Sequence, residues 1–381
     1  MVKLPSAAMA AFLLAGSPLA PAQGEPAQED METVLVTGEQ PGPGLWKVSR
    51  DGHVMWVFGT IGEVPDTIAW RTKEIEARIA ESQEVLYPGW PSAGLSISAF
   101  QAMTLVPLAF KAAKNPNGAT LKDVFSPDDY ATWLRLKQKY LGDDEDIEKY
   151  RPMVAEEKLN SAIGRKHALK GVRMTWVDEV VRKAAKKHKV RLHYLPPVER
   201  NIKIEKPRAI LKEARKIDLA EGDCVGRNFA RLEKAEAQGL FKFDAASVNA
   251  WATGDLDTFR ANAAIRGDPD LVREDCTTAA LNAVVNSQSL EPGNELSRGL
   301  DLVKQQEKLL AEAGAEAYLN WMAAAEKALA ENTSTFAVLP MNMVLDPKGW
   351  LSKLEEKGYA VEYSQELRST TENAGVAPAS E

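Results

Sequence analysis

The side chains that most often catalyse reactions or bind metals are few in this chain. Its four histidines are His53, His167, His188 and His193, and no two of them have the spacing of a His-Glu-x-x-His pair. The chain also lacks a Gly-x-Ser-x-Gly elbow, a phosphate-binding loop and a complete dinucleotide fingerprint. We interpret the first three histidines as surface residues and His193 as a core residue of a strand. No standard catalytic motif is therefore present.

A strand followed by a turn, at residues 53–63, is the segment best placed to present side chains to a cleft. Apolar residues alternate along residues 53–58, which predicts a half-buried strand. Gly59 ends this strand, and Thr60, Gly62 and Glu63 follow it. Glycine has no side-chain donor atom, so Gly62 cannot bind a metal through a side chain.

Several further strands and helices are expected to form such a cleft. We expect strands at residues 84–87, 190–195 and 336–339, because each is a short apolar run bounded by turn residues. Helical periodicity predicts a helix over residues 176–188 and a mainly helical region over residues 95–169. A strand, a turn and a helix follow one another both near the start and near the end of the chain, so two such units could face each other.

Several segments resemble, in their order and spacing, motifs of the TraB/GumN family, which includes the Tiki-type metal-dependent peptidases. These segments are Gly44-Leu45-Trp46-Lys47-Val48, Gly59-Thr60-Ile61, Arg151-Pro152-Met153, Trp251-Ala252-Thr253-Gly254-Asp255 and Phe336 to Tyr359. The resemblance covers about Gly44 to Val361. It implies a mixed α/β (α+β) fold in which two small β-sheets pack with many helices around one cleft. In the helix–turn–helix motif, Asp255 would cap the following helix.

The departures from the family pattern fall at the cleft. The first family motif ends in a metal-binding His, and that position is Gly62 here. The second His of the family, across the cleft, corresponds to Asn342. An acidic residue is expected where Tyr87 stands, and Leu319 replaces the Arg that precedes Asn320. The framework motifs are retained.

These substitutions predict a degenerate metal site. A hydrolytic metal needs about three protein ligands and one open position for water. Gly62 offers no ligand, and the neutral amide of Asn342 is a poor ligand for zinc-like ions. Glu63 and Asp66 could act as substitutes, although carboxylates before a helix are also favoured by the helix dipole. We therefore assign no cofactor, no metal ligand and no catalytic residue.

Cys224 and Cys276 are the only two cysteines. In an oxidising compartment two cysteines suggest one disulfide. Closing a loop of this length would stabilise the fold by about 4 kcal/mol in the chain-entropy model. The alternative is two buried free thiols.

The N-terminus has the pattern of a secretory signal. Lys3 precedes an apolar stretch, and Ala20-Pro21-Ala22 is a small-x-small cleavage site. The alternative is an unstructured Ala-rich tail. No later segment approaches the ~20 apolar residues of a membrane span. We thus predict a periplasmic or secreted protein, with a signal peptide at 1–22, a polar linker at 23–43, a TraB/GumN-like domain at 44–363 and a disordered tail at 364–381.

The bulk composition limits the class of partner. The chain has 381 residues, of which 45% are hydrophobic and 27% charged, as in ordinary globular proteins. Its net charge of -7 and pI near 5.5 argue against nucleic acid, which requires a basic face.

The function that these observations favour is non-catalytic. We expect a pseudoenzyme that uses the retained cleft to hold an unknown peptide, glycan or envelope protein. One alternative is a metal-dependent peptidase or hydrolase with substituted ligands. Another is an exopolysaccharide-related envelope factor, which only the GumN name suggests. The candidate cleft residues are Gly59, Thr60, Gly62, Glu63, Tyr87, Asn320 and Asn342.

Overall fold

The computed structural model describes residues 2–4, 35, 37–168, 172–216, 221–242, 244–277, 279–280 and 294–364. Most of the predicted signal peptide, much of the predicted linker and nearly all of the predicted C-terminal tail lie outside these ranges.

The strands of the described residues form three sheets. The largest has six strands in the order β11-β2-β3-β10-β5-β8, a second has the order β1-β6-β9, and β4 pairs with β7. The bounds are β1 (Val2–Leu4), β2 (Leu45–Arg50), β3 (His53–Thr60), β4 (Glu63–Pro65), β5 (Glu84–Tyr87), β6 (Pro91–Ile97), β7 (Met174–Trp176), β8 (Arg191–Tyr194), β9 (Val198–Lys203), β10 (Ser334–Pro340) and β11 (Ala360–Tyr363).

Four neighbouring strands of the large sheet, β3, β10, β5 and β8, run parallel to one another. Their carboxyl ends therefore meet at one edge of the sheet. All four residues of β5 and the central residues of β3 and β10 are buried, as expected for strands covered on both faces. This edge is the place where open α/β sheets usually bind ligands.

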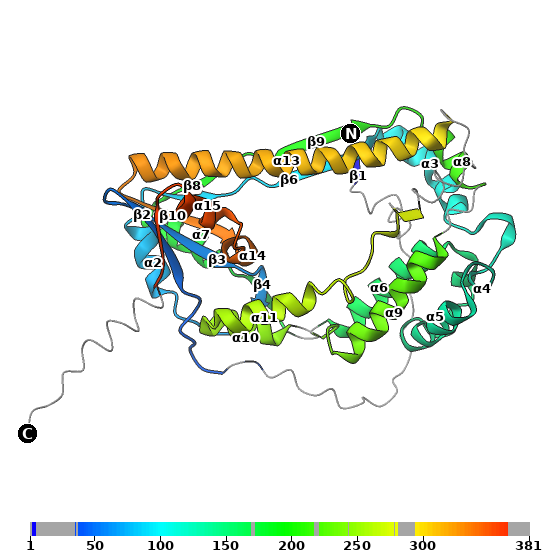
Figure 1. Ribbon diagram of the computed structural model, residues 1–381, viewed down its shortest axis with the longest axis horizontal. Helices are drawn as coiled ribbons and strands as arrows, with labels where there is room; N and C mark the ends of the chain where they lie inside the picture. Colours follow the sequence, from blue (N-terminus) through cyan, green and yellow to red (C-terminus); the bar gives the residue numbers. More distant parts are fainter. Residues whose placement is uncertain are drawn as a thin grey trace, which may run out of the picture.

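Helices cover the large sheet and build the rest of the molecule (Figure 1). Their bounds are α2 (Lys73–Ala80), α3 (Ala99–Ala112), α4 (Leu121–Val124), α5 (Pro127–Tyr140), α6 (Pro152–His167), α7 (Glu179–His188), α8 (Pro207–Ala214), α9 (Gly222–Ala237), α10 (Ala245–Thr253), α11 (Leu256–Arg266), α13 (Glu295–Glu331), α14 (Met341–Leu345) and α15 (Trp350–Glu356), with short 3-10 turns at Pro116–Gly118 and Asp146–Lys149.

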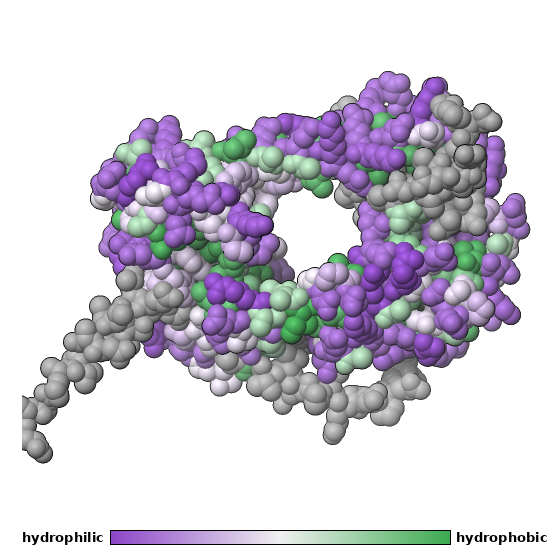
Figure 2. All heavy atoms as spheres, in the orientation of Figure 1, coloured by the Kyte–Doolittle hydropathy of each residue, from purple (hydrophilic) through white to green (hydrophobic). Residues whose placement is uncertain are grey.

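The buried apolar residues form three main clusters. The sheet body contains the large sheet with α2, α7, α10 and the C-terminal half of α13. The helical body contains α4, α5, α6 and α9. The α3/α8 end contains β6, α3, α8 and the start of α13. The single helix α13 thus connects the core of the sheet body with the core of the α3/α8 end. Figure 2 shows an opening between the sheet body and the helical body.

Side-chain caps set several helix starts. Ser98 and Gln101 form a capping box at α3. The Asp255 carboxylate accepts a hydrogen bond from the Thr258 amide at 3.0 Å, so the predicted cap of α11 is confirmed. Asn294 caps α13 in the same way.

The mixed α/β fold predicted from the sequence is confirmed, and its details differ in four respects. Residues 95–97 belong to β6 rather than to a helix, because residues 95 and 96 pair with β9, residue 97 pairs with β1, and the Ser98 cap starts α3 only afterwards. The polar strand β9 was not predicted, since charged residues interrupt its apolar pattern. Trp176 lies in β7, which pairs with β4, and α7 starts only at Glu179. The described residues form three sheets instead of two.

Candidate functional site

The two motif turns begin side by side at the carboxyl edge of the large sheet. In the parallel pairing of β3 with β10, Gly59 lies opposite Leu339 and Thr60 opposite Pro340. Gly62 and Asn342 each follow two residues after the last paired position. The structure therefore places both substituted positions after the ends of adjacent strands.

The end of β3 is held in place by a buried hydrogen bond. The indole Nε1 of Trp251, in α10, donates to the Gly59 carbonyl oxygen at 2.9 Å. A Cβ atom at position 59 would lie 2.8 Å from the Sδ atom of Met341, so a larger residue would require a shift. The Thr60 hydroxyl donates to the Leu339 carbonyl at 3.4 Å and links the two strand ends. Gly59 and Thr60 thus help to fix the ends of the two strands.

Gly62 adopts a backbone conformation that suits glycine. Its φ is +89°, in the left-handed region. Its carbonyl accepts a hydrogen bond from the Val177 amide at 2.9 Å, which ties the turn to the segment after β7. A Cβ atom here would have only Trp176 nearby, at 3.9 Å. Space is available for a side chain, but the backbone would be strained.

Glu63 and Asp66, the two possible substitute ligands, are both solvent-exposed. Glu63 lies opposite Trp176 in the short β4–β7 sheet. The Asp66 amide donates to the Arg173 carbonyl at 2.9 Å. The two residues flank a buried pair, so the backbone of this segment is fixed while both carboxylates face water.

Tyr87 ends β5 and is 93% buried, with a relative exposure of 7%. Its ring stacks on Tyr194 at the end of β8, with ring centroids 4.6 Å apart. Burial raises the pKa of Tyr87, and the negative charge of Asp178 raises it further. Within the described residues its hydroxyl has no hydrogen-bond partner. A neutral phenol thus stands where the family is expected to carry an acid.

The two candidate asparagines occupy different places. Asn342 lies in the first turn of α14 and is exposed at the carboxyl edge. Asn320 is exposed on α13, outside the strand ends, and follows Leu319, which is 62% exposed. Gly62, Thr60 and Asn342 are thus brought to adjacent strand ends, Tyr87 lies one strand further along, and Asn320 lies on a helix.

The histidines are engaged elsewhere. His53 Nδ1 lies 2.7 Å from the Asn332 carbonyl, His188 contacts Glu76 at 2.9 Å, and His193 contacts Glu84 at 3.0 Å. His193 lies on β8, an edge strand, and its side chain is 37% exposed rather than in the core. His167 packs against Tyr140. Across the ranges that the structure describes, no three His, Cys, Asp or Glu side chains cluster closely enough to hold a metal ion.

The sequence profile of the TraB/PrgY/gumN family matches residues 44–363. The chain belongs to this family. The resemblance indicated by the sequence motifs is therefore confirmed over most of the chain. No match was found among curated proteins or among solved structures.

The donor set at the carboxyl edge does not fit the metal that TraB/GumN proteins are expected to bind. Gly62 supplies no side chain, the Asn342 amide is neutral, and the Tyr87 phenol stays protonated because its pKa is raised. Zinc-like ions prefer imidazole, thiolate or carboxylate ligands. No reaction step through a metal can be derived from these residues.

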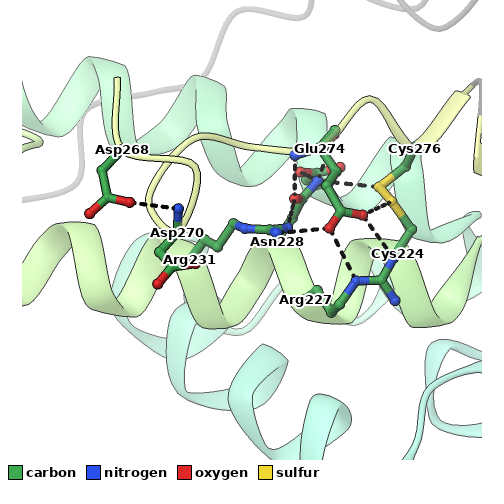
Figure 3. Close-up of polar contacts among 9 residues, drawn as sticks. Cys224, Arg227, Asn228, Arg231, Asp268, Asp270, Glu274 and Cys276 are labelled. Carbon is green, nitrogen blue, oxygen red and sulfur yellow. Dashed lines mark hydrogen bonds and ion pairs between the residues drawn. A yellow bond between two sulfur atoms is a disulfide. The ribbon is translucent and has the colours of Figure 1, made fainter. Parts of the chain in front are cut away.

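This TraB/PrgY/gumN chain also carries a disulfide in its helical body (Figure 3). Cys224 on α9 is bonded to Cys276, 52 residues later, with an S–S distance of 2.08 Å. The predicted disulfide is confirmed, and the alternative of two free thiols is wrong. The bond fixes the segment after α11 against α9.

A polar network surrounds this disulfide and was not predicted from the sequence. Glu274 binds Arg227 at 2.7 Å and Arg231 at 2.8 Å, both from α9. Asn228, fully buried, donates to Glu156 at 2.9 Å and accepts from the Glu274 amide at 2.8 Å. The only local signal was that Arg227, Asn228 and Arg231 share one face of a helix.

The ion pairs of Glu274 predict a specific acid sensitivity. Hydrogen bonds from Arg227 and then Arg231 lower the pKa of Glu274 to about 2. Because the folded-state pKa is depressed, ionised Glu274 stabilises the fold above its ordinary pKa of about 4.3, and this stabilisation is lost as the pH falls toward 2. Glu274→Gln should therefore lower the urea midpoint at neutral pH and converge with the wild type in acid.

Asp270→Asn is the matched control for this measurement. Its carboxylate is 77% exposed and lies 3.4 Å from Lys234, so its removal should change the urea midpoint little at any pH. A gap between wild type and Glu274→Gln that stays constant down to about pH 3 would contradict the assignment.

Proposed function

We propose that this chain is an exported, periplasmic member of the TraB/PrgY/gumN family that binds a ligand without catalysing a reaction. Residues 1–22 are its signal peptide, so strand β1, which pairs with β6 in the full chain, is absent from the exported protein. The carboxyl edge of the large sheet holds a peptide, a glycan or an envelope protein. The metal site of the family is degenerate in this chain.

One observation carries this proposal. The adjacent parallel strands β3 and β10 end in turns whose substituted positions are Gly62 and Asn342. The left-handed backbone at Gly62 also disfavours the side chain that a metal ligand would need. The Trp251–Gly59 hydrogen bond, which joins two of the family motifs, supports an intact framework around these turns.

Exposed aromatic side chains support a binding role for this edge. Trp176, beside Gly62, is 56% exposed, and Tyr194, stacked on Tyr87, is 54% exposed. Trp90, in the loop after β5, is 51% exposed. Large aromatic groups left in solvent mark interaction sites more often than single exposed aliphatic residues do.

The disulfide supports export. Stable disulfides form in oxidising compartments such as the periplasm and are rare in the cytosol. The Cys224–Cys276 bond is buried in the helical body, with both cysteines 4% exposed. A chain with this bond and a signal-like N-terminus fits the periplasm.

Metal retention tests the proposal directly. Purified protein equilibrated with manganese, cobalt or zinc and then desalted should keep much less than one metal per chain, measured by elemental analysis. Stoichiometric metal that is lost in Glu63→Ala or Asp66→Ala, and kept in the exposed control Glu199→Ala, would replace the proposal with the hydrolase alternative.

A second experiment restores the two histidines that the family is expected to carry. Gly62→His combined with Asn342→His should increase metal retention over the wild type. The His at position 62 should also lower the free energy of unfolding by about 1–2 kcal/mol, because the backbone there is left-handed. A folded double variant that gains no metal would show that these turns are not the metal positions of the family.

A further inference from the structure

Helix α3 has two apolar faces, and only one of them is covered. Ala102 and Leu105 point into the core of the α3/α8 end and are 8% and 6% exposed. Phe100, Met103 and Phe110 are 77%, 76% and 44% exposed. A helix packed on one side normally carries polar residues on the other. The outer face of α3 thus departs from the usual pattern.

The three exposed residues form one stripe along the helix. With 3.6 residues per turn, offsets of three and ten residues place Phe100, Met103 and Phe110 within roughly 80° of one another. Pro107, also exposed, lies between them. The stripe is about 15 Å long. Grouped apolar side chains of this size on a surface mark an interaction site.

The same end of the molecule is basic in an acidic protein. Residues 99–114 and 198–216 together contain nine Lys and Arg but only three acidic residues, whereas the whole chain has a net charge of -7. Arg208 and Lys212 on α8 and Arg215, the residue at its C-terminal cap, follow at intervals of four and three residues and are all exposed. They form a basic stripe on the outer face of α8.

The apolar and basic stripes lie on two neighbouring helices. Leu105 of α3 and Ile210 of α8 are buried in the same core. The Gln101 side chain of α3 donates to the Glu205 carbonyl just before α8, at 3.4 Å. The two helices therefore pack against each other at this end of the molecule, and the exposed residues of each lie on the side away from that core (Figure 1).

We propose that the α3/α8 end docks on the surface of an anionic phospholipid membrane. Phe100, Met103 and Phe110 enter the boundary between headgroups and acyl chains, and Arg208, Lys212 and Arg215 contact lipid phosphates. Apolar side chains on a helix beside a basic rim are the features by which proteins bind membranes peripherally. The basic rim is complementary in charge to an anionic bilayer, whose phosphates lie at the depth of the headgroups beside the apolar stripe. This inference goes beyond the ligand-binding role of the sheet edge.

Vesicle binding tests this surface. The purified protein should partition onto vesicles of phosphatidylcholine with phosphatidylglycerol and much less onto phosphatidylcholine alone. Arg208→Glu with Lys212→Glu should weaken partitioning by at least about tenfold, since each basic residue contributes about 1 kcal/mol near an anionic surface. Phe100→Ser with Met103→Ser should weaken it by about tenfold or more, because the apolar contact is lost.

A matched control and a local probe complete the experiment. Leu134→Ser with Leu319→Ser removes exposed leucines outside this surface, 43% and 62% exposed, and should leave partitioning unchanged. The chain has nine tryptophans of its own, so the emission of Phe100→Trp is taken as its difference from the wild type. This difference emission should shift to shorter wavelength on vesicles and be quenched by brominated lipids.

Four outcomes would overturn the proposal. These are absence of binding to anionic vesicles, equal binding to neutral vesicles, an equal loss in the leucine control, and an unchanged emission of Phe100→Trp on bound protein. Dimers that Phe100→Ser disrupts, without vesicle binding, would assign the stripe to a second copy of the chain instead.

Discussion

Replacing Trp251 with alanine should lower the free energy of unfolding by about 3–5 kcal/mol, the usual range for a buried tryptophan. Trp251 is 1% exposed and lies in the core of the sheet body. Its ring centroid is 5.1 Å from that of Trp70 and 6.3 Å from that of Phe58. Its indole also donates to the Gly59 carbonyl at the candidate site. Urea unfolding followed by circular dichroism measures the change.

Two further variants separate packing from hydrogen bonding. Trp251→Phe keeps an aromatic ring but leaves the Gly59 carbonyl without its donor, which should cost about 1–3 kcal/mol from the hydrogen bond. Trp90→Ala, at a tryptophan that is 51% exposed, should change stability by no more than about 0.5 kcal/mol. An alanine variant of Trp251 as stable as that of Trp90 would refute the role given to this residue.

Loss of the disulfide should lower the free energy of unfolding by an amount similar to that expected for Trp251→Ala. The bond closes a loop with a sequence separation of 52, and removing it should lower the free energy of unfolding by about 4 kcal/mol. Cys224→Ala with Cys276→Ala should therefore unfold at a clearly lower urea concentration. The segment around Glu274 would lose its covalent attachment to α9, although its ion pairs with Arg227 and Arg231 could still form.

Reduction provides the control for this experiment. A reducing agent should lower the stability of the wild type to that of the double alanine variant and leave the variant itself unchanged. Equal stability of oxidised and reduced wild type would show that the bond does not hold the helical body together. A reducing agent that destabilises the variant as well would mean that the effect does not come from this bond.

Local sequence patterns determined a substantial part of this structure. The apolar runs that became β5 and β10 were recognisable because short buried strands have a characteristic length and composition, and the run that became the edge strand β8 was recognisable from the turn residues that bound it. The cap at Asp255 was predictable because a cap needs only a side-chain oxygen next to a helix start. The order of the motifs was sufficient to indicate the family, which the profile match over residues 44–363 confirmed.

Local sequence patterns did not predict the structure where a strand or a helix face depends on partners distant in the sequence. Strand β9 is polar and forms because β6 lies beside it. Helix α3 is apolar nearly all round, so the sequence did not show which face would remain in solvent. The buried bonds of Asn228 join α9 to α6 and to the segment before Cys276, and no local rule predicts such a network.

The sequence by itself determined the family, the kind of fold and which residue types stand at the motif positions. Only the tertiary structure decided that the turns after β3 and β10 are neighbours, although Thr60 and Leu339 are 279 residues apart. It also decided that Gly62 has a left-handed backbone and that Cys224 meets Cys276. The physical reason is that periodicity specifies which face of an element is apolar, whereas the partner of that face is selected by packing of the whole chain.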